Sequence, residues 1–501
     1  MLETMFLLII SSIIFVLFNS LLKWFRNPKK NLPPSPSKLP IIGNFHQLGS
    51  LPHRPLQKLA QKHGPVFLLH LGQVPVLVVT SPDAAREIMK THDQIFASRP
   101  KTTVASILLY DCKDMVFSPY GEYWRQVKSI GVLNLLSNKR VQPYKTVREE
   151  ETRVMVEKIT EASNNNQVIN INDLFRSLTN DVVSRVALGC KISEREKGRK
   201  FKVLLMELGQ SASALCIGDY VPWLWWVDRV NGLIGKVKII AKEVDDFIQG
   251  IVDDHLEKMK KGESKEDNKN FVEILLDIQR EYRLGFPIST DTIKALILDM
   301  FAAGTDTTSI GLEWMVTELL RHPQVMNKLQ NEVRRVVKGK PNVTEEDLEK
   351  MSYLKLVIKE TLRLHTPVPT LVPRESTHYT KIQGYDIEAG TQVIINAWAI
   401  GRDPSVWKDP EEFRPERFLN SRIDFKGLDF EYTPFGAGRR GCPGIQFALA
   451  VTELALATLL YRFDIALPPG KRAEDMDMTE TPGFNAHPQS TIFVVATPYM
   501  G

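Results

Sequence analysis

The sequence predicts a mainly helical fold with a smaller β-rich part. Helical patterns dominate residues 120–337 of this 501-residue chain. Two apolar runs rich in valine and leucine, residues 66–72 and 74–81, predict an antiparallel pair of strands. Short strands and turns return after residue 379. Because no internal repeat or change of composition divides the chain, we expect one large body over residues 44–501.

The composition fits a large globular protein with a modest positive charge. Hydrophobic residues make up 43% and charged residues 25% of the chain, which is ample for a large core. The net charge is +5 at pH 7, and no long run of lysine and arginine occurs. This diffuse excess argues against a nucleic-acid partner. It suits contact with anionic lipid or with an acidic protein.

The cysteines are few and widely spaced: Cys112, Cys190, Cys216 and Cys442. The absence of a CxxC pair from the sequence argues against a disulfide scaffold and against a zinc site of the usual spacing. We expect the first three to be buried small apolar residues. The fourth lies in an unusual loop and needs another explanation.

The front of the chain predicts a membrane anchor. Residues 5–22 form an apolar run without charge, long enough to cross a bilayer core of about 30 Å. Basic residues follow the run, so we expect the rest of the chain to stay on the cytosolic side. A cleaved signal peptide is the alternative, but its basic residues would come first. We assign residues 1–26 to the anchor and residues 27–43, which are basic and proline-rich, to a stiff linker.

The Cys loop, FGAGRRGCPG at residues 435–444, leads directly into a helical pattern. Its four glycines permit positive φ angles and let a flat ligand lie against the backbone. The start of the next helix, Arg439 and Arg440 favour negative charge on sulfur. We therefore expect a metal-binding thiolate at Cys442. The alternative is a free cysteine in a surface loop.

The stretch AAGTDTTS, residues 302–309, lies inside a helical pattern that extends from about residue 293 to 321. Gly304 and the polar residues that follow it as far as Thr308 are poor choices for a helix interior. A break of the local rules at one point in a long helix favours a functional site. A kink in a core helix is the alternative.

Three further patterns combine charged residues. KETLRLH places Glu360 and Arg363 on one face of a helix, and FRPERF contains Arg417. WRQVK contains Trp124 and Lys128. Taken alone, each pattern fits a solvated surface whose ion pairs contribute little.

Together these motifs resemble the signatures of the cytochromes P450. FGAGRRGCPG matches the haem-binding pattern F-x-x-G-x-R-x-C-x-G, and AAGTDTTS matches the oxygen-binding groove [AG]-G-x-[DE]-T-[TS] of the central helix. Their order along the chain is similar to plant A-type microsomal members, in particular to the A-subfamily-like members of the large specialised-metabolism family. The resemblance implies the P450 fold, with haem between a long central helix and the helix after the Cys loop.

The resemblance implies haem b as the cofactor, with Cys442 as the axial ligand of its iron. A thiolate in this position pushes electron density onto iron and favours O–O cleavage. The resemblance assigns further residues to the haem: Arg440, Trp124, Lys128 and Arg374 at the propionates, and Phe435 and Gly436 beside the sulfur and the ring.

The resemblance also implies roles for residues of the central helix. Gly304 gives room over the iron, Thr307 hydrogen-bonds during oxygen activation, and Asp306 gates the delivery of protons.

A buried structural triad behind the Cys loop is implied as well, formed by Glu360, Arg363 and Arg417. The implied partners are NADPH–cytochrome P450 reductase, which passes on electrons from NADPH, together with cytochrome b5, membrane lipid and a hydrophobic small molecule. The implied location is the endoplasmic reticulum membrane, with one membrane-spanning segment and a cytosolic catalytic domain.

By analogy, the substrate pocket is walled by mostly apolar segments, which favours a hydrophobic ligand. These are residues 103–116, 208–218, 301–302, 367–372 and 481–484. The last departs from the family pattern, because NAHPQSTIF follows Phe484 where many relatives have a basic pair and a proline.

We therefore expect a monooxygenase, an oxidoreductase that uses O2 and NADPH to oxidise a hydrophobic plant specialised metabolite such as a terpenoid or an indole alkaloid. A haem-dependent dehydratase or lyase without net use of O2, for example an aldoxime dehydratase, is the alternative. A third hypothesis is a membrane-anchored haem protein that binds a ligand or a gas without turnover. Asp306 and Thr307 favour the first, because they serve proton-coupled oxygen activation.

Overall fold

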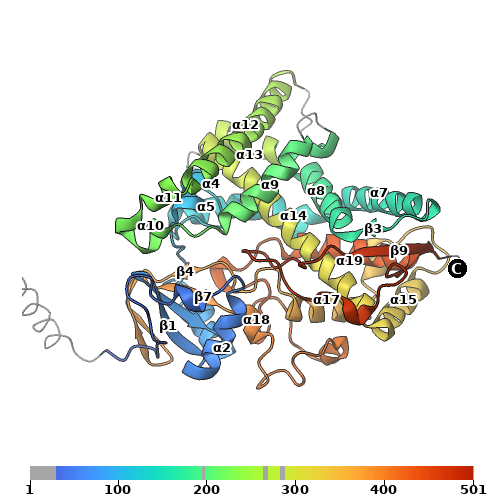
Figure 1. The fold of residues 1–501 in the computed structure, drawn as a ribbon. Helices are drawn as coiled ribbons and strands as arrows, with labels where there is room; N and C mark the ends of the chain where they lie inside the picture. The colour runs from blue at the N-terminus through green and yellow to red at the C-terminus, as the bar shows by residue number, and fades with distance from the viewer. Residues whose placement is uncertain (1–29, 195–197, 263–268, 282–287, 500–501) are drawn as a thin grey trace, which may run out of the picture.

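The computed structural model describes residues 30–499, apart from 195–197, 263–268 and 282–287. The helices are α2 (His53–His63), α3 (Pro82–Arg86), α4 (Thr103–Leu108), α5 (Glu122–Gly131), α6 (Asn138–Val141), α7 (Lys145–Asn164), α8 (Ile171–Leu188), α9 (Gly198–Ala212), α10 (Ile217–Tyr220), α11 (Val227–Val230), α12 (Leu233–Lys260), α13 (Phe271–Glu281), α14 (Thr290–Arg321), α15 (Pro323–Val337), α16 (Glu345–Leu348), α17 (Ser352–Leu364), α18 (Ala397–Ile400) and α19 (Ile445–Arg462). The strands are β1 (Val66–Leu71), β2 (Val74–Val79), β3 (Ile169–Asn170), β4 (Arg374–Glu375), β5 (Thr380–Ile382), β6 (Tyr385–Ile387), β7 (Gln392–Ile395), β8 (Phe463–Ala466) and β9 (Phe493–Pro498). The mainly helical class with a smaller β part is confirmed, and Figure 1 shows the β1 sheet beside a larger helical body.

The largest sheet places one predicted site residue. Its order is β1-β2-β7-β4, and β1 and β2 form the predicted antiparallel pair. Strand β2 pairs in parallel with β7, and β7 pairs antiparallel with β4. The turn after β1 requires Gly72, whose φ is +59°, because a Cβ there would lie 2.3 Å from the Tyr220 carbonyl oxygen. Arg374 opens β4, so this sheet determines where its side chain starts.

Helix α14 is the long central helix that the sequence predicts. The Ser289 hydroxyl accepts a hydrogen bond from the Thr292 N–H at 3.2 Å and caps its start. The helix ends at Arg321, where the helical pattern of the sequence also ends. Helices α8, α17 and α19 pack against it (Figure 1). This packing buries most of its length and leaves the AAGTDTTS stretch as the exception.

Helix α19 begins three residues after Cys442. Among the described residues it is the one helix long and apolar enough to cross a membrane, and 61% of its apolar window is buried. A helix that is apolar on all sides and packed by protein belongs to the core. The predicted anchor, residues 1–26, lies outside the described residues.

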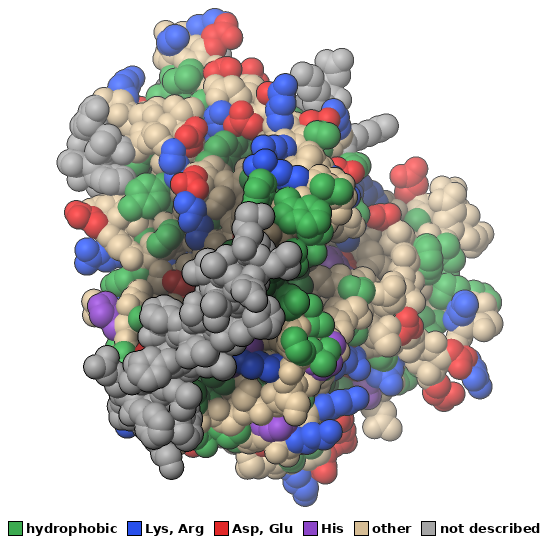
Figure 2. All heavy atoms as spheres, turned by 60° about the vertical axis from the view of Figure 1, so that its left-hand side comes forward, with side chains coloured by type: hydrophobic (Ala, Val, Ile, Leu, Met, Phe, Trp, Pro, Cys, Tyr) green, Lys and Arg blue, Asp and Glu red, His purple; other side chains and the backbone are tan. Residues whose placement is uncertain are grey.

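Exposed tryptophans gather on one side of the molecule. Trp223, Trp225 and Trp226, between α10 and α11, are each about half exposed. The exposed Ile41 and Ile42 belong to the N-terminal segment that packs against α10 through neighbouring aromatic rings. Figure 2 turns this side of the molecule forward and shows hydrophobic side chains beside lysines and arginines. Such a mixture of aromatic and basic groups suits a lipid interface.

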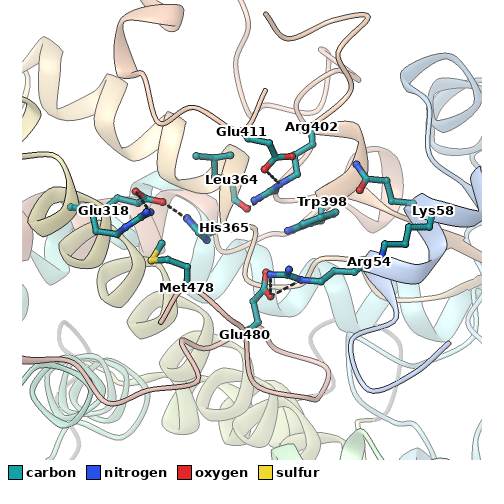
Figure 3. Close-up of a pocket in the computed structure, with 12 residues that line it drawn as sticks. Arg54, Lys58, Glu318, Leu364, His365, Trp398, Arg402, Glu411, Met478 and Glu480 are labelled. Atoms are coloured by element: carbon teal, nitrogen blue, oxygen red, sulfur yellow. Dashed lines mark hydrogen bonds and ion pairs between the residues drawn. The ribbon is translucent and has the colours of Figure 1, made fainter. Parts of the chain in front are cut away.

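A pocket of about 410 Å³ opens between α2, α14, α17 and α18 (Figure 3). Three pairs of its polar side chains are in contact: Arg54 with Glu480 at 3.0 Å, Arg402 with Glu411 at 3.1 Å, and His365 with Glu318 at 2.6 Å. None of its lining residues belongs to the Cys loop or to AAGTDTTS. The chemistry predicted from the sequence therefore lies elsewhere.

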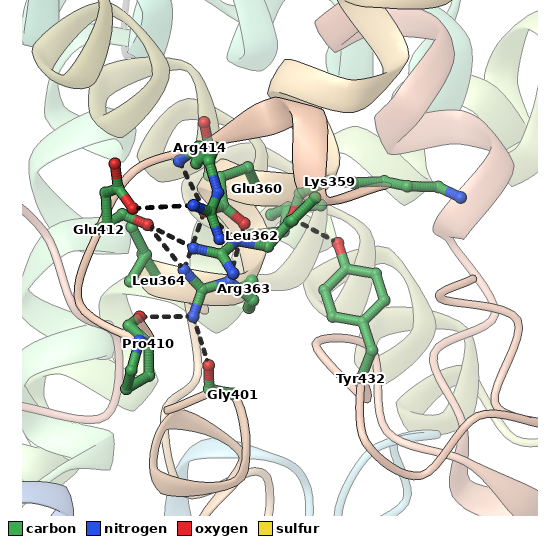
Figure 4. Close-up of polar contacts among 12 residues, drawn as sticks. Lys359, Glu360, Leu362, Arg363, Leu364, Gly401, Pro410, Glu412, Arg414 and Tyr432 are labelled. Carbon is green, nitrogen blue, oxygen red and sulfur yellow. Dashed lines mark hydrogen bonds and ion pairs between the residues drawn. The ribbon is translucent and has the colours of Figure 1, made fainter. Parts of the chain in front are cut away.

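The predicted triad is assembled in the interior. Arg363 donates to both carboxylate oxygens of Glu360, at 2.7 and 2.9 Å, and Arg417 donates to the same carboxylate at 2.7 Å. Glu360 and Arg363 are fully buried, and Arg363 also donates to the carbonyl oxygens of Gly401 and Pro410 (Figure 4). These contacts tie α17 to the segments that precede the Cys loop.

We predict that Glu360→Gln destabilises the protein by about 3–5 kcal/mol, because it strands two buried guanidinium groups. Thermal unfolding of the haem-loaded protein measures the loss. Asp475→Asn, which breaks an exposed pair with Arg472, is the matched control and should cause no measurable loss. Equal unfolding temperatures for both variants would contradict the importance of the triad.

Candidate active site

The Cys loop is a tight turn that only glycine permits at one position. Gly436 and Gly438 have positive φ angles of 65° and 69°. A Cβ on Gly438 would lie 2.1 Å from the Met89 carbonyl oxygen. Gly441 and Gly444 keep negative φ angles of −58° and −90°. Two of the four glycines therefore provide the left-handed backbone that bends the loop.

Cys442 closes this turn, and its N–H donates to the Phe435 carbonyl oxygen at 2.9 Å. Its side chain is exposed. Yet burial raises the pKa of its thiol, against the opposing effects of the Gly444 N–H and of Lys128. The Cys442 side chain is thus accessible to solvent and yet surrounded closely enough by protein to be desolvated. This combination indicates that the sulfur faces an internal cavity. In the metal-free loop, desolvation outweighs the Gly444 N–H at the helix start. A bound metal would remove the thiol proton, so the metal-binding thiolate stays a prediction.

The four residues predicted to reach the propionates come together beside the Cys loop. The Arg440 guanidinium lies 4.1 Å from the ring centroid of Trp124, and the Lys128 Nζ lies 5.1 Å from the same centroid. Arg374 donates to the Ala437 carbonyl oxygen at 2.8 Å. Burial, and next the charge of Arg374, lower the pKa of Arg440 to about 9.

Arg99 joins this group, although the sequence analysis assigned it no role. It donates to the carbonyl oxygens of Val372 and Pro373 at 2.5 and 2.7 Å. Burial, followed by the charges of Arg374 and Arg440, lowers its pKa well below the usual value. The signal available in the sequence was FASRP, where an arginine directly follows small and apolar residues.

The acidic residues nearby balance only part of this charge. Asp93 contacts Arg374 at 3.3 Å and Arg439 at 3.0 Å. The sequence had suggested that Arg439 adds positive charge near the sulfur. In the structure its side chain pairs with Asp93 instead. Asp114 lies close enough to raise the pKa of Arg440, but burial raises its own pKa to about 6. The remaining buried positive charge fits an anionic ligand, and the carboxylates of a haem have that charge.

In the AAGTDTTS stretch, several residues of α14 are less buried than the rest of the helix. Ala303 is exposed in the middle of a buried helix, so it faces the interior of the site. The Thr307 hydroxyl donates to the Ala303 carbonyl oxygen at 2.6 Å. Gly304 points elsewhere, since a Cβ on it would lie 3.3 Å from Val183 of α8. Its missing side chain therefore lets α8 approach α14.

Asp306 points toward the C-terminal segment rather than toward Thr307. Its carboxylate accepts from the Asn485 amide at 2.6 Å and from His487 Nε2 at 3.1 Å. Burial acts to raise the pKa of Asp306, but the His487 and Asn485 hydrogen bonds outweigh it and the pKa is lowered. Sequence reasoning missed both partners, although NAHPQSTIF was noted as a departure from the family pattern.

Two of the predicted pocket walls meet in the structure. The Phe484 N–H of the late turn donates to the Ser213 hydroxyl at 2.9 Å, which joins segments 481–484 and 208–218. Phe301 of α14 packs edge-on against Phe201 of α9, with ring centroids 5.5 Å apart. The C-terminal turn, α9 and α14 thus border the same region.

Comparison with known proteins agrees with this geometry. A protein-family model described as Cytochrome P450 matches residues 33–495. The chain is 53% identical over 498 residues to "Cytochrome P450 71A4" of Solanum melongena, covering 99% of this chain and 98% of the relative. It is 51% identical over 478 residues to "Tabersonine/lochnericine 19-hydroxylase" of Catharanthus roseus, covering 95% and 94%.

A solved structure of a zebrafish cytochrome P450 with abiraterone matches the fold with a TM-score of 0.76. The two share 24% sequence identity, and the match covers 90% of this chain and 100% of that one. This likeness supports the fold, while the family model and the plant relatives establish the family. The chain belongs to the cytochrome P450 family and is a plant A-type member, a haem-dependent monooxygenase supplied with electrons from NADPH through a reductase.

Proposed function

We propose that this P450 is a membrane-anchored monooxygenase that oxidises a hydrophobic plant specialised metabolite, a terpenoid or an indole alkaloid. The observation that carries the proposal is that two adjacent residues of α14 serve proton chemistry: the Thr307 hydroxyl donates to the Ala303 carbonyl oxygen, and the pKa of Asp306 is lowered by its hydrogen bonds to His487 and Asn485 against the effect of burial. A relative named as a hydroxylase of tabersonine and lochnericine supports this substrate class. The mostly apolar predicted walls support a hydrophobic ligand.

The Cys loop and the neighbouring cations hold the haem in this proposal. Cys442 would ligate the haem iron through its sulfur, and the thiolate-bound haem would supply the oxidising chemistry. Phe435 and Gly436 would lie beside the sulfur and the ring. The cationic group beside the loop would hold the propionates; it consists of Arg440, Arg374, Lys128 and Arg99 together with the Trp124 ring.

In this proposal, residues of the AAGTDTTS stretch deliver the protons that oxygen activation consumes. The Thr307 hydroxyl lies beside the exposed Ala303 and supplies a hydrogen bond on the oxygen-binding side of α14. Asp306 takes up protons on the C-terminal side of the same helix and delivers them toward Thr307. Gly304 has its role at the contact between helices, because its missing side chain lets α8 pack closely against α14.

The proposed location is the endoplasmic reticulum membrane, with the catalytic domain, residues 44–501, in the cytosol. Residues 1–26 anchor the chain and residues 27–43 form the linker. The exposed Trp223, Trp225 and Trp226 support contact of the catalytic domain with lipid. The basic residues around them suit an anionic surface, and cytochrome b5 is proposed as an additional electron donor.

We predict that Cys442→Ala abolishes thiolate-ligated haem. The difference spectrum of the reduced protein with carbon monoxide detects the sulfur ligand, because the thiolate determines the position of the absorption band. Cys190→Ala is the matched control and should keep the wild-type spectrum. A thiolate-type spectrum in Cys442→Ala would rule out Cys442 as the ligand.

Thr307→Ala should keep the haem but lose product, because electrons are diverted to hydrogen peroxide when proton delivery fails. We expect product formed per NADPH to fall at least about tenfold. Thr317→Ala is the matched control, since Thr317 makes the same kind of hydrogen bond to a carbonyl one turn back on α14, at 2.8 Å. Unchanged coupling in Thr307→Ala would remove this residue from the mechanism.

The proposed reaction is tested with membranes that contain this protein and a plant reductase. We would supply NADPH, isotopically labelled oxygen gas and a pool of terpenes, indole alkaloids and aldoximes, and identify products by mass spectrometry. A labelled oxygen atom in an NADPH-dependent product is the expected result. An unlabelled product that forms without oxygen would instead establish the dehydratase or lyase reaction.

A further inference from the structure

A histidine that the proposed function does not use lies between two carboxylates of α14. His487 belongs to the segment before β9, and its Nε2 lies 3.1 Å from a carboxylate oxygen of Asp306. Its Nδ1 lies 3.3 Å from Glu313 Oε2. Asp306 and Glu313 are seven residues apart, which places them on the same face two turns apart along the helix. The imidazole ring therefore bridges the oxygen-binding stretch and the buried middle of α14.

The geometry favours a charged histidine. When both carboxyl groups are ionised they only accept hydrogen bonds, so both ring nitrogens of His487 donate, and only the imidazolium can do so. Burial acts to lower the pKa of His487, but the hydrogen bonds to Asp306 and Glu313 outweigh it and raise the pKa to about 9. At neutral pH the ring is a cation held between two anions.

Neighbouring groups hold both carboxylates in this arrangement. The Asn485 amide donates to the Asp306 carboxylate at 2.6 Å, and the Asn172 amide of α8 donates to the Glu313 carboxylate at 2.9 Å. Arg176 of α8 adds a more distant positive charge that also lowers the pKa of Asp306. Glu313 is fully buried, so its charge needs a cation in contact, which His487 provides.

We propose that His487 is a positioning residue for oxygen activation, which in its cationic form holds the Asp306 carboxylate on the C-terminal side of α14 and keeps it ionised, with Glu313 as the second counter-charge. This inference rests on the proposed function, because it assigns Asp306 the proton-carrying role. It adds that Asp306 is kept in its ionised form, ready to accept a proton, by His487, which comes from the C-terminal segment before β9. Without the cation, burial would favour the protonated acid and the carboxylate would lose its fixed orientation.

The first test measures the ion pair without turnover, as thermal unfolding of the haem-loaded protein from about pH 6 to about pH 9.5. The variants are His487→Gln, His487→Lys and the matched control His378→Gln, an exposed histidine. Because the pKa of His487 is raised from 6.5 to about 9, its stabilisation is complete below pH 6.5 and is lost as pH rises through 9.

The expected result is a lower unfolding temperature for His487→Gln than for wild type at pH 6.5, with a difference that shrinks toward pH 9.5. His487→Lys should keep more of this stability at high pH, because a lysine remains charged there. His378→Gln should match wild type throughout. A difference between wild type and His487→Gln that does not change with pH would overturn the ion pair.

The second test measures product formed per NADPH in the same variants. We expect His487→Gln to lose coupling by about tenfold, the lower end of what the loss of a supporting partner costs at an active site. His487→Lys should recover part of it. Full coupling in His487→Gln would overturn the positioning role even if the ion pair is confirmed. If wild type itself forms no oxygenated product, the proposed function fails, and the pH dependence of stability still decides the ion pair.

Discussion

Buried positive charge beside the Cys loop is the constraint on which the site depends. Arg99, Arg374 and Arg440 are held in the interior by backbone carbonyl oxygens. Burial lowers the pKa of each, and the charge of Arg374 lowers the pKa of Arg99 and Arg440 further. Asp93 and Asp114 offset only part of the repulsion. The carboxylates of a bound haem would complete the balance, and the cofactor would then also stabilise the fold that binds it.

The Cys442 sulfur, like the buried arginines, needs a counter-charge when it is ionised. The free Cys442 thiol has a raised pKa, since a site dry enough for oxidation chemistry also opposes an isolated thiolate. The iron would supply the missing counter-charge. On α14 the counter-charge comes from a protein group, because the cationic ring of His487 contacts both Asp306 and Glu313 and offsets part of their negative charge. Contacts between opposite charges in the interior therefore support both parts of the site.

Short motifs in the sequence predicted the parts of the site that are local. The Cys loop, the start and end of α14, and the face shared by Glu360 and Arg363 follow from residues within a few turns of one another. Contacts between distant segments could not be predicted in this way. Arg99 lies near the charges of Arg374 in β4 and Arg440 in the Cys loop, and His487 contacts Asp306 of α14. The desolvation that raises the pKa of the free Cys442 thiol was also beyond motif reading, which includes only the helix start.

The structure of the haem-loaded protein, determined by crystallography or electron microscopy, tests the central claim most directly. We predict that the sulfur of Cys442 ligates the iron and that the propionates lie within about 2.7–2.9 Å of the nitrogens of Arg374, Arg440 or Lys128. Carbonyl contacts of these cations would then be partly exchanged for carboxylate contacts. An iron ligated by another side chain, or propionates that turn away from these cations, would contradict the claim that the buried positive charge exists to hold the cofactor.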